Sequence, residues 1–358
     1  MFKYSRYFTL TVVLTMLAFV ILETLFNEKT FFTSKQPSRS VALNGKENRS
    51  KPISDKILCR MRPEYSRHEE MKLDTKVVNN VEAMLMFIAF QRSGHTLIGS
   101  LLDAHPNMVI ANEYDILSNW RKYAPKFRNR QYLFEQLYTN SYLEAHEGDR
   151  SSQDCLPKTK YHYVIPNQWQ GQFDKNIKII GDKKGGTTVI LLTSSPKYVS
   201  FLQEIQRVVK VPIKFLHVVR NPFDNIATIE LRNMFRHDLN WTNIYNTPVK
   251  IPKKKLIKRI SSHTRLEKTI IQLKQRLGDQ VHTVKSEDFI ANPELELRKI
   301  CRFLNIQCSQ KYINDCISIV YSKISRSRNG IIWDRDTKDM VIKFMKPYPY
   351  YNGYKFEE

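Results

Sequence analysis

The chain has 358 residues, of which 42% are hydrophobic, and a formal net charge of +22 at pH 7. This hydrophobic content supports a packed core and excludes a chain that is disordered throughout. The excess of basic residues indicates an anionic partner, such as a nucleotide, an acidic glycan, a nucleic acid or a membrane surface.

The N-terminus predicts a membrane anchor. Lys3 and Arg6 precede an uncharged apolar run, which extends with one interruption to residue 26 and reaches the length that a membrane span requires. No small-residue cleavage site follows it, so we expect a signal anchor, with residues 1–6 in the cytosol and a transmembrane helix over residues 7–26. A cleaved signal peptide is the alternative.

Residues 27–82 are polar, with few apolar clusters, and predict a flexible stem. A single domain is then expected over residues 83–358. Glycosylation sequons at Asn48 and Asn240 agree with a luminal location of everything after the anchor.

The segment from residue 83 to residue 102 predicts a buried strand, a tight turn and a helix. Residues 83–90 form a continuous apolar run, and from His95 the apolar positions recur at helical spacing. Free amides at the start of that helix and the positive end of its dipole make an anion site, to which Arg92 adds charge. Gly94 allows the backbone to approach the ligand closely. The predicted contacts are Arg92, Ser93, Gly94, His95, Thr96 and Leu97.

This loop lacks the GxxxxGK[ST] pattern of nucleoside triphosphatases. The Lys and the magnesium-binding hydroxyl do not occur at the required offsets, which argues against a P-loop kinase. A shorter loop with Arg in place of Lys suits a phosphosulfate that is held without a metal.

Two further strands are predicted to end at basic residues. Residues 213–219 form an apolar run that ends at Arg220, and Thr228 lies eight residues later in a helical pattern. The guanidinium at the strand end and a hydroxyl two turns into the helix can share one anion. A shorter strand beginning at Ile177 runs into a basic, glycine-rich turn at Lys183 and Lys184.

Residues 284–304 include apolar positions, among them Leu297 and Ile300, that are core candidates. Cys301 lies beside these apolar positions and is also expected in the core. Cys308 and Cys316 are close enough in sequence for a local disulfide, although the pairing of the five cysteines stays open. Their spacings include no CxxC pair or other zinc pattern, and no metal is expected.

These segments resemble the sulfotransferases that use 3′-phosphoadenosine-5′-phosphosulfate (PAPS). RSGHTL at residues 92–97, LLDAHP at residues 101–106 and then Glu113 are similar to the 5′-phosphosulfate loop of the Golgi branch, which includes carbohydrate and protein-tyrosine sulfotransferases. The resemblance implies an α/β fold, with a P-loop-like central parallel sheet flanked by helices, and PAPS as co-substrate. His95 departs from the family pattern, which usually has a second hydroxyl there, but an imidazole donor can replace a hydroxyl.

The resemblance also implies roles for single residues. Arg220 and Thr228 match the pair that holds the 3′-phosphate, and Lys183, with Lys184 as the alternative, matches a lysine that contacts the transferring group. Glu113 matches the base that removes the acceptor proton, with Asp115 as a weaker candidate. Arg92 and Lys183 would stabilise charge on the leaving phosphate. The basic loop before Trp333 is similar to the one that closes over the adenosine, through Arg326 or Arg328.

The sequence therefore predicts a single-pass type II membrane protein of the Golgi that transfers a sulfuryl group from PAPS to a hydroxyl of a glycan or glycoprotein in the lumen. Tyrosine in a protein is the alternative acceptor, and nucleic acid is not expected. A catalytically inactive nucleotide- or glycan-binding membrane protein is the alternative from another class. The basic run at residues 250–259 either steers an anionic acceptor or is a solvated face.

Overall fold

The computed structural model describes residues 71–153, 159, 161–235 and 247–357. By its contacts the chain divides into residues Met1–Pro52 and Ile53–Glu358, and the fold described below belongs to the second unit. The predicted cytosolic tail, transmembrane helix and most of the stem lie outside the described residues, as do both sequons. Among the helices that the structure does describe, none has the length and apolar character needed to cross a bilayer.

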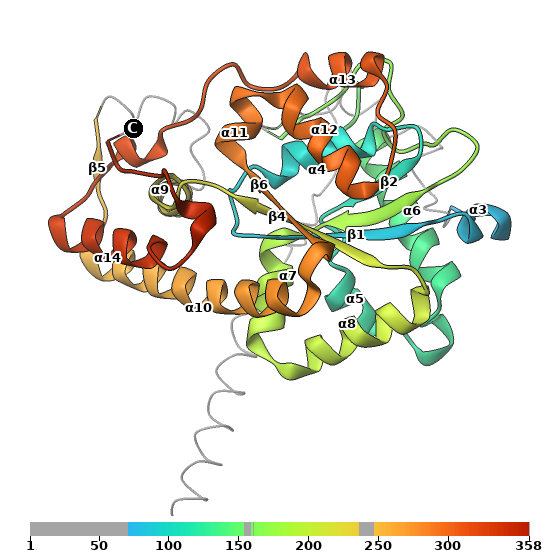
Figure 1. Cartoon of the computed structure of the whole chain (residues 1–358), viewed down its shortest axis with the longest axis horizontal. Coiled ribbons are helices and arrows are strands. Elements are labelled where there is room, and N and C mark those ends of the chain that lie inside the picture. The colour runs from blue at the N-terminus through green and yellow to red at the C-terminus, as the bar shows by residue number, and fades with distance from the viewer. Residues whose placement is uncertain (1–70, 154–158, 160, 236–246, 358) are drawn as a thin grey trace, which may run out of the picture. The chain divides into compact units, whose positions relative to one another are not determined.

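A five-stranded, fully parallel sheet forms the centre of the domain (Figure 1). Its strands lie in the order β2-β3-β1-β4-β6, and β1 in the middle is buried along its whole length. A parallel sheet covered on both faces requires continuous apolar strands, which is the pattern of residues 83–90 and 213–219. The strands are β1 (Ala83–Ala89), β2 (Met108–Asn112), β3 (Ile179–Lys183), β4 (Ile213–Val219) and β6 (Val281–Lys285).

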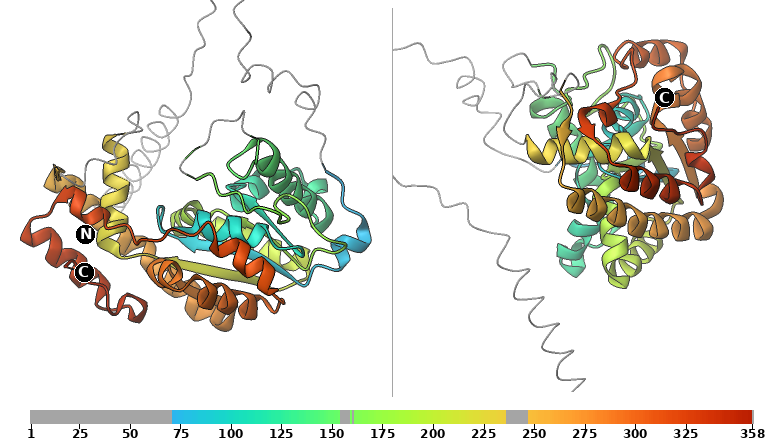
Figure 2. Two further views of the ribbon diagram at one scale, coloured as in Figure 1. Left: turned by 90° about the horizontal axis from the view of Figure 1, so that it is seen from above. Right: turned by 90° about the vertical axis from the view of Figure 1, so that its left-hand side faces the viewer.

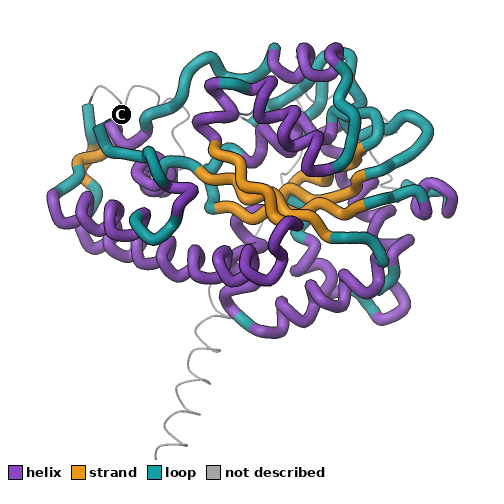
Figure 3. Tube along the Cα trace, in the orientation of Figure 1, coloured by secondary structure: helices purple, strands orange, loops and turns teal. Residues whose placement is uncertain are grey.

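Helices cover both faces of the sheet (Figures 2 and 3). One face packs against α4 (His95–Asp103), α11 (Ser286–Ala291), α12 (Pro293–Leu304) and α13 (Gln310–Ile317). The other face packs against α5 (Ile116–Lys122), α6 (Arg130–Glu147), α7 (Gly185–Ser194), α8 (Pro196–Val209), α9 (Pro222–Met234), α10 (Lys253–Leu277) and α14 (Arg335–Met345). The predicted α/β architecture with a central parallel sheet flanked by helices is confirmed.

A two-stranded parallel sheet joins β5 (Val249–Lys250) to β7 (Ile331–Ile332). Short 3₁₀ turns occur at Pro125–Phe127, Gly278–Gln280, Ser327–Gly330 and Pro349–Tyr351. The small sheet connects the segment before α10 to the C-terminal segment, so that the C-terminus packs beside α9 and α10.

Packed structure begins before the expected boundary at residue 83. The helix α3 (Thr75–Asn79) starts at an Asp74 cap, and Leu73, Val78 and Val81 are buried in the same core as the sheet. Three apolar side chains spread over nine residues are too few to stand out in a polar sequence, yet they are enough to dock the segment. Residues 71–82 therefore belong to the packed domain and not to the stem.

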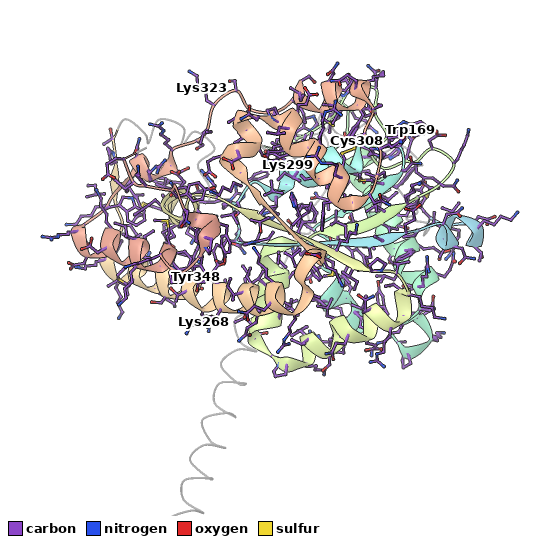
Figure 4. All side chains as sticks on the ribbon, in the orientation of Figure 1. Trp169, Lys268, Lys299, Cys308, Lys323 and Tyr348 are labelled. Atoms are coloured by element: carbon purple, nitrogen blue, oxygen red, sulfur yellow. A yellow bond between two sulfur atoms is a disulfide. The ribbon has the colours of Figure 1, made fainter. Side chains whose placement is uncertain are left out.

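The pairing that the sequence left open is settled for one pair, and it is not the local bridge between Cys308 and Cys316. Helix α12 ends at Leu304, the next residue Asn305 is left-handed (φ 58°), and the chain reverses so that Cys308 pairs with Cys301 across a Cα separation of 6.2 Å. Cys316 is a buried free thiol on α13. Cys301 is buried, as expected for a core residue, but it is also a disulfide partner. Figure 4 labels Cys308, which follows helix α12 in the chain.

Candidate functional site

The loop between β1 and α4 has an unusual backbone. Arg92 and Gly94 both have positive φ, of 70° and 87°. The positive φ favours glycine at position 94, and a Cβ there would also lie 2.7 Å from the Ser286 hydroxyl oxygen, which would have to turn away. No side chain caps the start of α4, and the first amides of this helix therefore face the loop as a potential anion site.

Asn225 on α9 holds this loop in place. Its side-chain amide donates to the Gln91 carbonyl at 2.7 Å and to the Ser93 hydroxyl at 3.2 Å. His263 on α10 lies 2.8 Å from the Asn225 carbonyl oxygen. The loop is thus fixed from the second motif segment, which sequence spacing alone does not reveal.

The ends of β2 and β3 bring three charged side chains together. Asn112 is in register with Lys183, so Glu113 follows directly beside the lysine. The Lys183 ammonium donates to Glu113 Oε1 at 2.5 Å and to the Thr96 hydroxyl at 3.3 Å, and Lys184 donates to the other Glu113 oxygen. Both predicted lysines therefore contact the predicted base.

This ion pairing sets the protonation of the group. Burial acts to raise the pKa of Glu113, but Lys183 and Lys184 outweigh it and hold that pKa at about 2. Burial lowers the pKa of Lys183, whose side chain is almost fully enclosed, and Glu113 opposes that shift. Glu113 is an ionised proton acceptor at neutral pH.

Arg220, at the end of β4, joins three segments. One terminal nitrogen donates to the Arg92 carbonyl at 3.0 Å and to the Thr228 hydroxyl at 3.2 Å, while the other donates to the Ser327 hydroxyl at 3.0 Å. Thr228 in turn donates to Ser327 at 2.8 Å. The predicted pair of Arg220 and Thr228 is therefore formed, and it lies against the Arg92 loop.

A single cavity of about 650 Å³ contains both basic clusters. Its walls come from the β1–α4 loop, the ends of β2 and β3, the start of α7, the face of α9 around Thr228, the start of α11 and the loop at residues 321–327. Cavities of this size hold a nucleotide-sized ligand. Lys323, labelled in Figure 4, lies on the loop that forms its outer edge.

Residues 85–310 match the family model described as "Sulfotransferase family", which spans both basic clusters. The chain belongs to the sulfotransferase family. No curated protein sequence matches it.

Several solved sulfotransferase structures are similar in outline. The sulfotransferase domain of the Synechococcus PCC 7002 olefin synthase is 15% identical, with a TM-score of 0.44, and the match covers 79% of this chain and 98% of that domain. The domain from the curacin biosynthetic pathway is 12% identical (TM-score 0.43, 77% and 98% covered). A mouse sulfotransferase complexed with PAP is 9% identical (TM-score 0.37, 76% and 89% covered). At these TM-scores the similarity supports no conclusion about substrates.

The sulfotransferase domain does not bring every predicted residue into the cavity. Arg326 is exposed and lies outside the lining, and Arg328 is buried in an ion pair with Asp224 at 3.4 Å. Between them, Ser327 contacts Arg220 and lines the cavity. The predicted loop is thus in place, but the side chain directed inward is the hydroxyl.

One residue of the β1–α4 loop, Ser93, points elsewhere than expected. Ser93 is buried against Asn225 and does not line the cavity, whereas Gly94, Thr96 and Leu97 do. His95 lines the cavity, and its buried Nδ1 has no hydrogen-bond partner among the described residues. Burial, followed by the charge of Lys183, lowers the pKa of His95 to about 3, so the ring is neutral and is suited to hydrogen bonding with a ligand.

Tyr161 is a cavity residue that the sequence did not single out. Its hydroxyl accepts hydrogen bonds from Arg92 and, at 2.5 Å, from Arg232 on α9. Both guanidinium groups also lie over its ring, with the Arg92 and Arg232 carbons 5.2 and 5.3 Å from the ring centre. No local pattern marks Tyr161, because it lies in an irregular segment and acquires its neighbours only through the fold.

The described residues contain no group of three or more His, Cys, Asp or Glu side chains arranged to hold a metal ion. The expectation of a metal-free reaction stays a prediction.

Proposed function

We propose that this sulfotransferase uses PAPS and transfers its sulfuryl group to a hydroxyl of a glycan. The observation that carries the proposal is the hydrogen bond from Arg220 to the Arg92 carbonyl, which places the two basic clusters in one cavity. A ligand with phosphate groups at two ends fits this arrangement, since each end meets its own guanidinium group.

The residues present fit such a ligand. At one end, the uncapped start of α4, the neutral His95 ring and the Arg92 side chain offer donors to a phosphosulfate. At the other end, Arg220, Thr228 and Ser327 line the cavity and hydrogen-bond one another, and the same donors can bind a phosphate instead. When bound, PAPS would supply the activated sulfuryl group.

Glu113 is the proposed general base. Its carboxylate lines the cavity and is ionised, so it can accept the proton that the acceptor hydroxyl loses. Lys183 and Arg92 stabilise negative charge at the leaving phosphate oxygen. Any turn of Lys183 away from Glu113 raises the pKa of the carboxyl group, which makes it a stronger base at the moment when the lysine is engaged elsewhere.

We further propose the predicted membrane topology: a cytosolic tail of residues 1–6, a signal anchor over residues 7–26, a stem that reaches to about residue 70 and a luminal Golgi domain after it. The disulfide between Cys301 and Cys308 supports an oxidising compartment. The net charge of +22 supports an anionic acceptor. Tyrosine in a protein is the second candidate acceptor, supported by the similarity of the loop and Glu113 to that branch.

The test is transfer from radiolabelled PAPS to a panel of glycans and tyrosine peptides by the luminal part of the chain, expressed from residue 27 onward. Glu113→Gln should lower kcat by about 10²- to 10⁴-fold, as expected for loss of a general base. The affinity of this variant for PAP, the nucleotide that remains when PAPS has given up its sulfuryl group, should not change when measured by calorimetry. If the wild type and Glu113→Gln both bind PAP equally well and neither transfers sulfate to any acceptor, the inactive binding protein is favoured. Absence of PAP binding would refute the co-substrate.

A further inference from the structure

Glu113 lies on a strained turn. The chain leaves β2 at Asn112, and two of the next three residues, Glu113 and Asp115, have φ of 58° and 63°. Each non-glycine residue in the left-handed region costs free energy, so surrounding contacts must fix such a conformation. The Asp115 side chain caps α5 by accepting from Ser118, which stabilises only the far side of the turn.

The contacts that fix the near side come from one buried carboxylate. Asp182 is 3% exposed, and its Oδ1 accepts from the Tyr114 amide at 3.0 Å. Its Oδ2 accepts from the amides of Asp115 at 2.9 Å and Ile116 at 3.3 Å. Three consecutive backbone amides therefore converge on a single side chain, whose two oxygens accept all three hydrogen bonds.

The position of Asp182 in the sheet connects it to the site. Consecutive residues of a strand point to opposite faces, so Asp182 and Lys183 leave β3 on different sides. Lys183 pairs with the carboxylate of Glu113, while Asp182 binds the backbone immediately after it. Two adjacent residues of one strand thus hold the proposed base by its side chain and by its main chain.

We propose that Asp182 is a positioning residue that fixes the β2–α5 turn and thereby aims Glu113 at the acceptor hydroxyl. Asp182 does not line the cavity, so it cannot touch a ligand there, and its hydrogen bonds to the site residues go to the backbone of the turn. This inference rests on the proposed role of Glu113. A base displaced by about 1 Å loses on the order of 10²-fold in rate, which sets the scale of the effect expected from a loosened turn.

The structural test is amide hydrogen exchange. In Asp182→Asn the side chain keeps one acceptor oxygen and directs an NH₂ group at the remaining amides. Exchange at Tyr114, Asp115 and Ile116 should become at least about tenfold faster, while β1 and β4 stay protected. Glu267→Gln is the matched control, because it also replaces a fully buried carboxylate by an amide but lies on α10, bonded to Tyr350 and Tyr351. Unchanged exchange at the three amides in Asp182→Asn overturns the proposal.

The functional test is a double-mutant cycle. Turnover is followed as transfer to the acceptor found in the panel or, without one, as release of inorganic sulfate from PAPS. Asp182→Asn should lower kcat at least about tenfold in the wild-type background with PAP affinity unchanged, and less than about twofold in the Glu113→Gln background, since residues that act as one unit are not additive. A merely structural residue gives the same loss in both backgrounds, and that result overturns the inference.

The two proposals fail differently. If Glu113→Gln itself leaves turnover unchanged, the assignment of the base is wrong. If Glu113→Gln lowers turnover but Asp182→Asn does not, or does so additively, only the positioning role is wrong. PAP binding and thermal unfolding establish that Asp182→Asn is folded. Should it not fold, Asp182→Ser, which retains one acceptor oxygen at a smaller volume, takes its place in the same two measurements.

Discussion

Substitution of Arg220 is the most direct test of whether the cavity binds a nucleotide with a 3′-phosphate. In the structure its guanidinium donates to the hydroxyls of Ser327 and Thr228 and to the carbonyls of Arg92 and Ser325. A phosphate at this position would replace the neutral hydroxyl acceptors by charged ones. A hydrogen bond to a charged group contributes about 1.5 to 3 kcal/mol, so Arg220→Ala should weaken PAP binding by about 10- to 150-fold.

Calorimetry with two ligands separates the possible causes. PAP carries the 3′-phosphate and adenosine 5′-phosphate lacks it, so only the affinity for PAP should fall in Arg220→Ala. Arg326→Ala is the matched control, because Arg326 is exposed and outside the cavity and should bind PAP as the wild type does. An equal loss for both ligands would mean that Arg220 acts by holding the Arg92 loop and not by binding the 3′-phosphate. Unchanged PAP affinity would remove Arg220 from the site altogether.

Three further predictions concern packing, the disulfide and pH. Gly99→Ala places a Cβ 2.6 Å from Lys183 Cγ, so it should cost about 1 to 3 kcal/mol of stability and also lower turnover; Ser200→Ala, on the exposed side of α8, should change neither thermal unfolding nor rate. Cys301→Ser opens a loop of seven residues and should lower the free energy of unfolding in urea by about 2 kcal/mol, with no further loss on adding reductant. Burial raises the pKa of Glu267 to about 7 against the opposing hydrogen bonds from Tyr350 and Tyr351. Because this folded-state pKa lies above the unfolded value, the stabilisation is complete below pH 4.5 and is lost as the pH rises through 7, by about 3 kcal/mol. The midpoint temperature of thermal unfolding should therefore fall less between pH 5 and pH 8 in Glu267→Gln than in the wild type. Part of the fall should remain, because burial also raises the pKa of Asp182 to about 7. An equally steep decline in that variant would contradict the assignment to Glu267.

The sheet was predictable because its signal is local. Strands buried on both faces are continuous apolar runs, and residues 83–90 and 213–219 correspond to β1 and β4 almost residue for residue. The anion loop was predictable for the same reason, since a strand, a glycine turn and a helix start follow one another within twenty residues. The family resemblance singled out Lys183 and Glu113, and the parallel register of β2 and β3 brings the two into contact.

What escaped prediction depends on contacts between distant segments. Asn225 supports a loop more than 130 residues earlier in the chain, and Tyr161 meets Arg92 and Arg232 only after the domain has folded. The C-terminal loop lines the cavity as expected, yet through Ser327, because a run of polar letters does not encode that Arg326 is exposed while Ser327 and Arg328 are buried. The early start of the domain at α3 was missed because only three apolar residues dock it.

The position of Tyr161 has a consequence for the reaction itself. An enzyme that activates a sulfuryl group for attack by hydroxyls must spare its own, and this phenol lies on the wall of the same cavity. Its oxygen has two lone pairs, and the guanidinium groups of Arg92 and Arg232 donate to that oxygen from two sides. With its lone pairs engaged in this way, the phenol oxygen of Tyr161 is less available as a nucleophile than a hydroxyl without such donors.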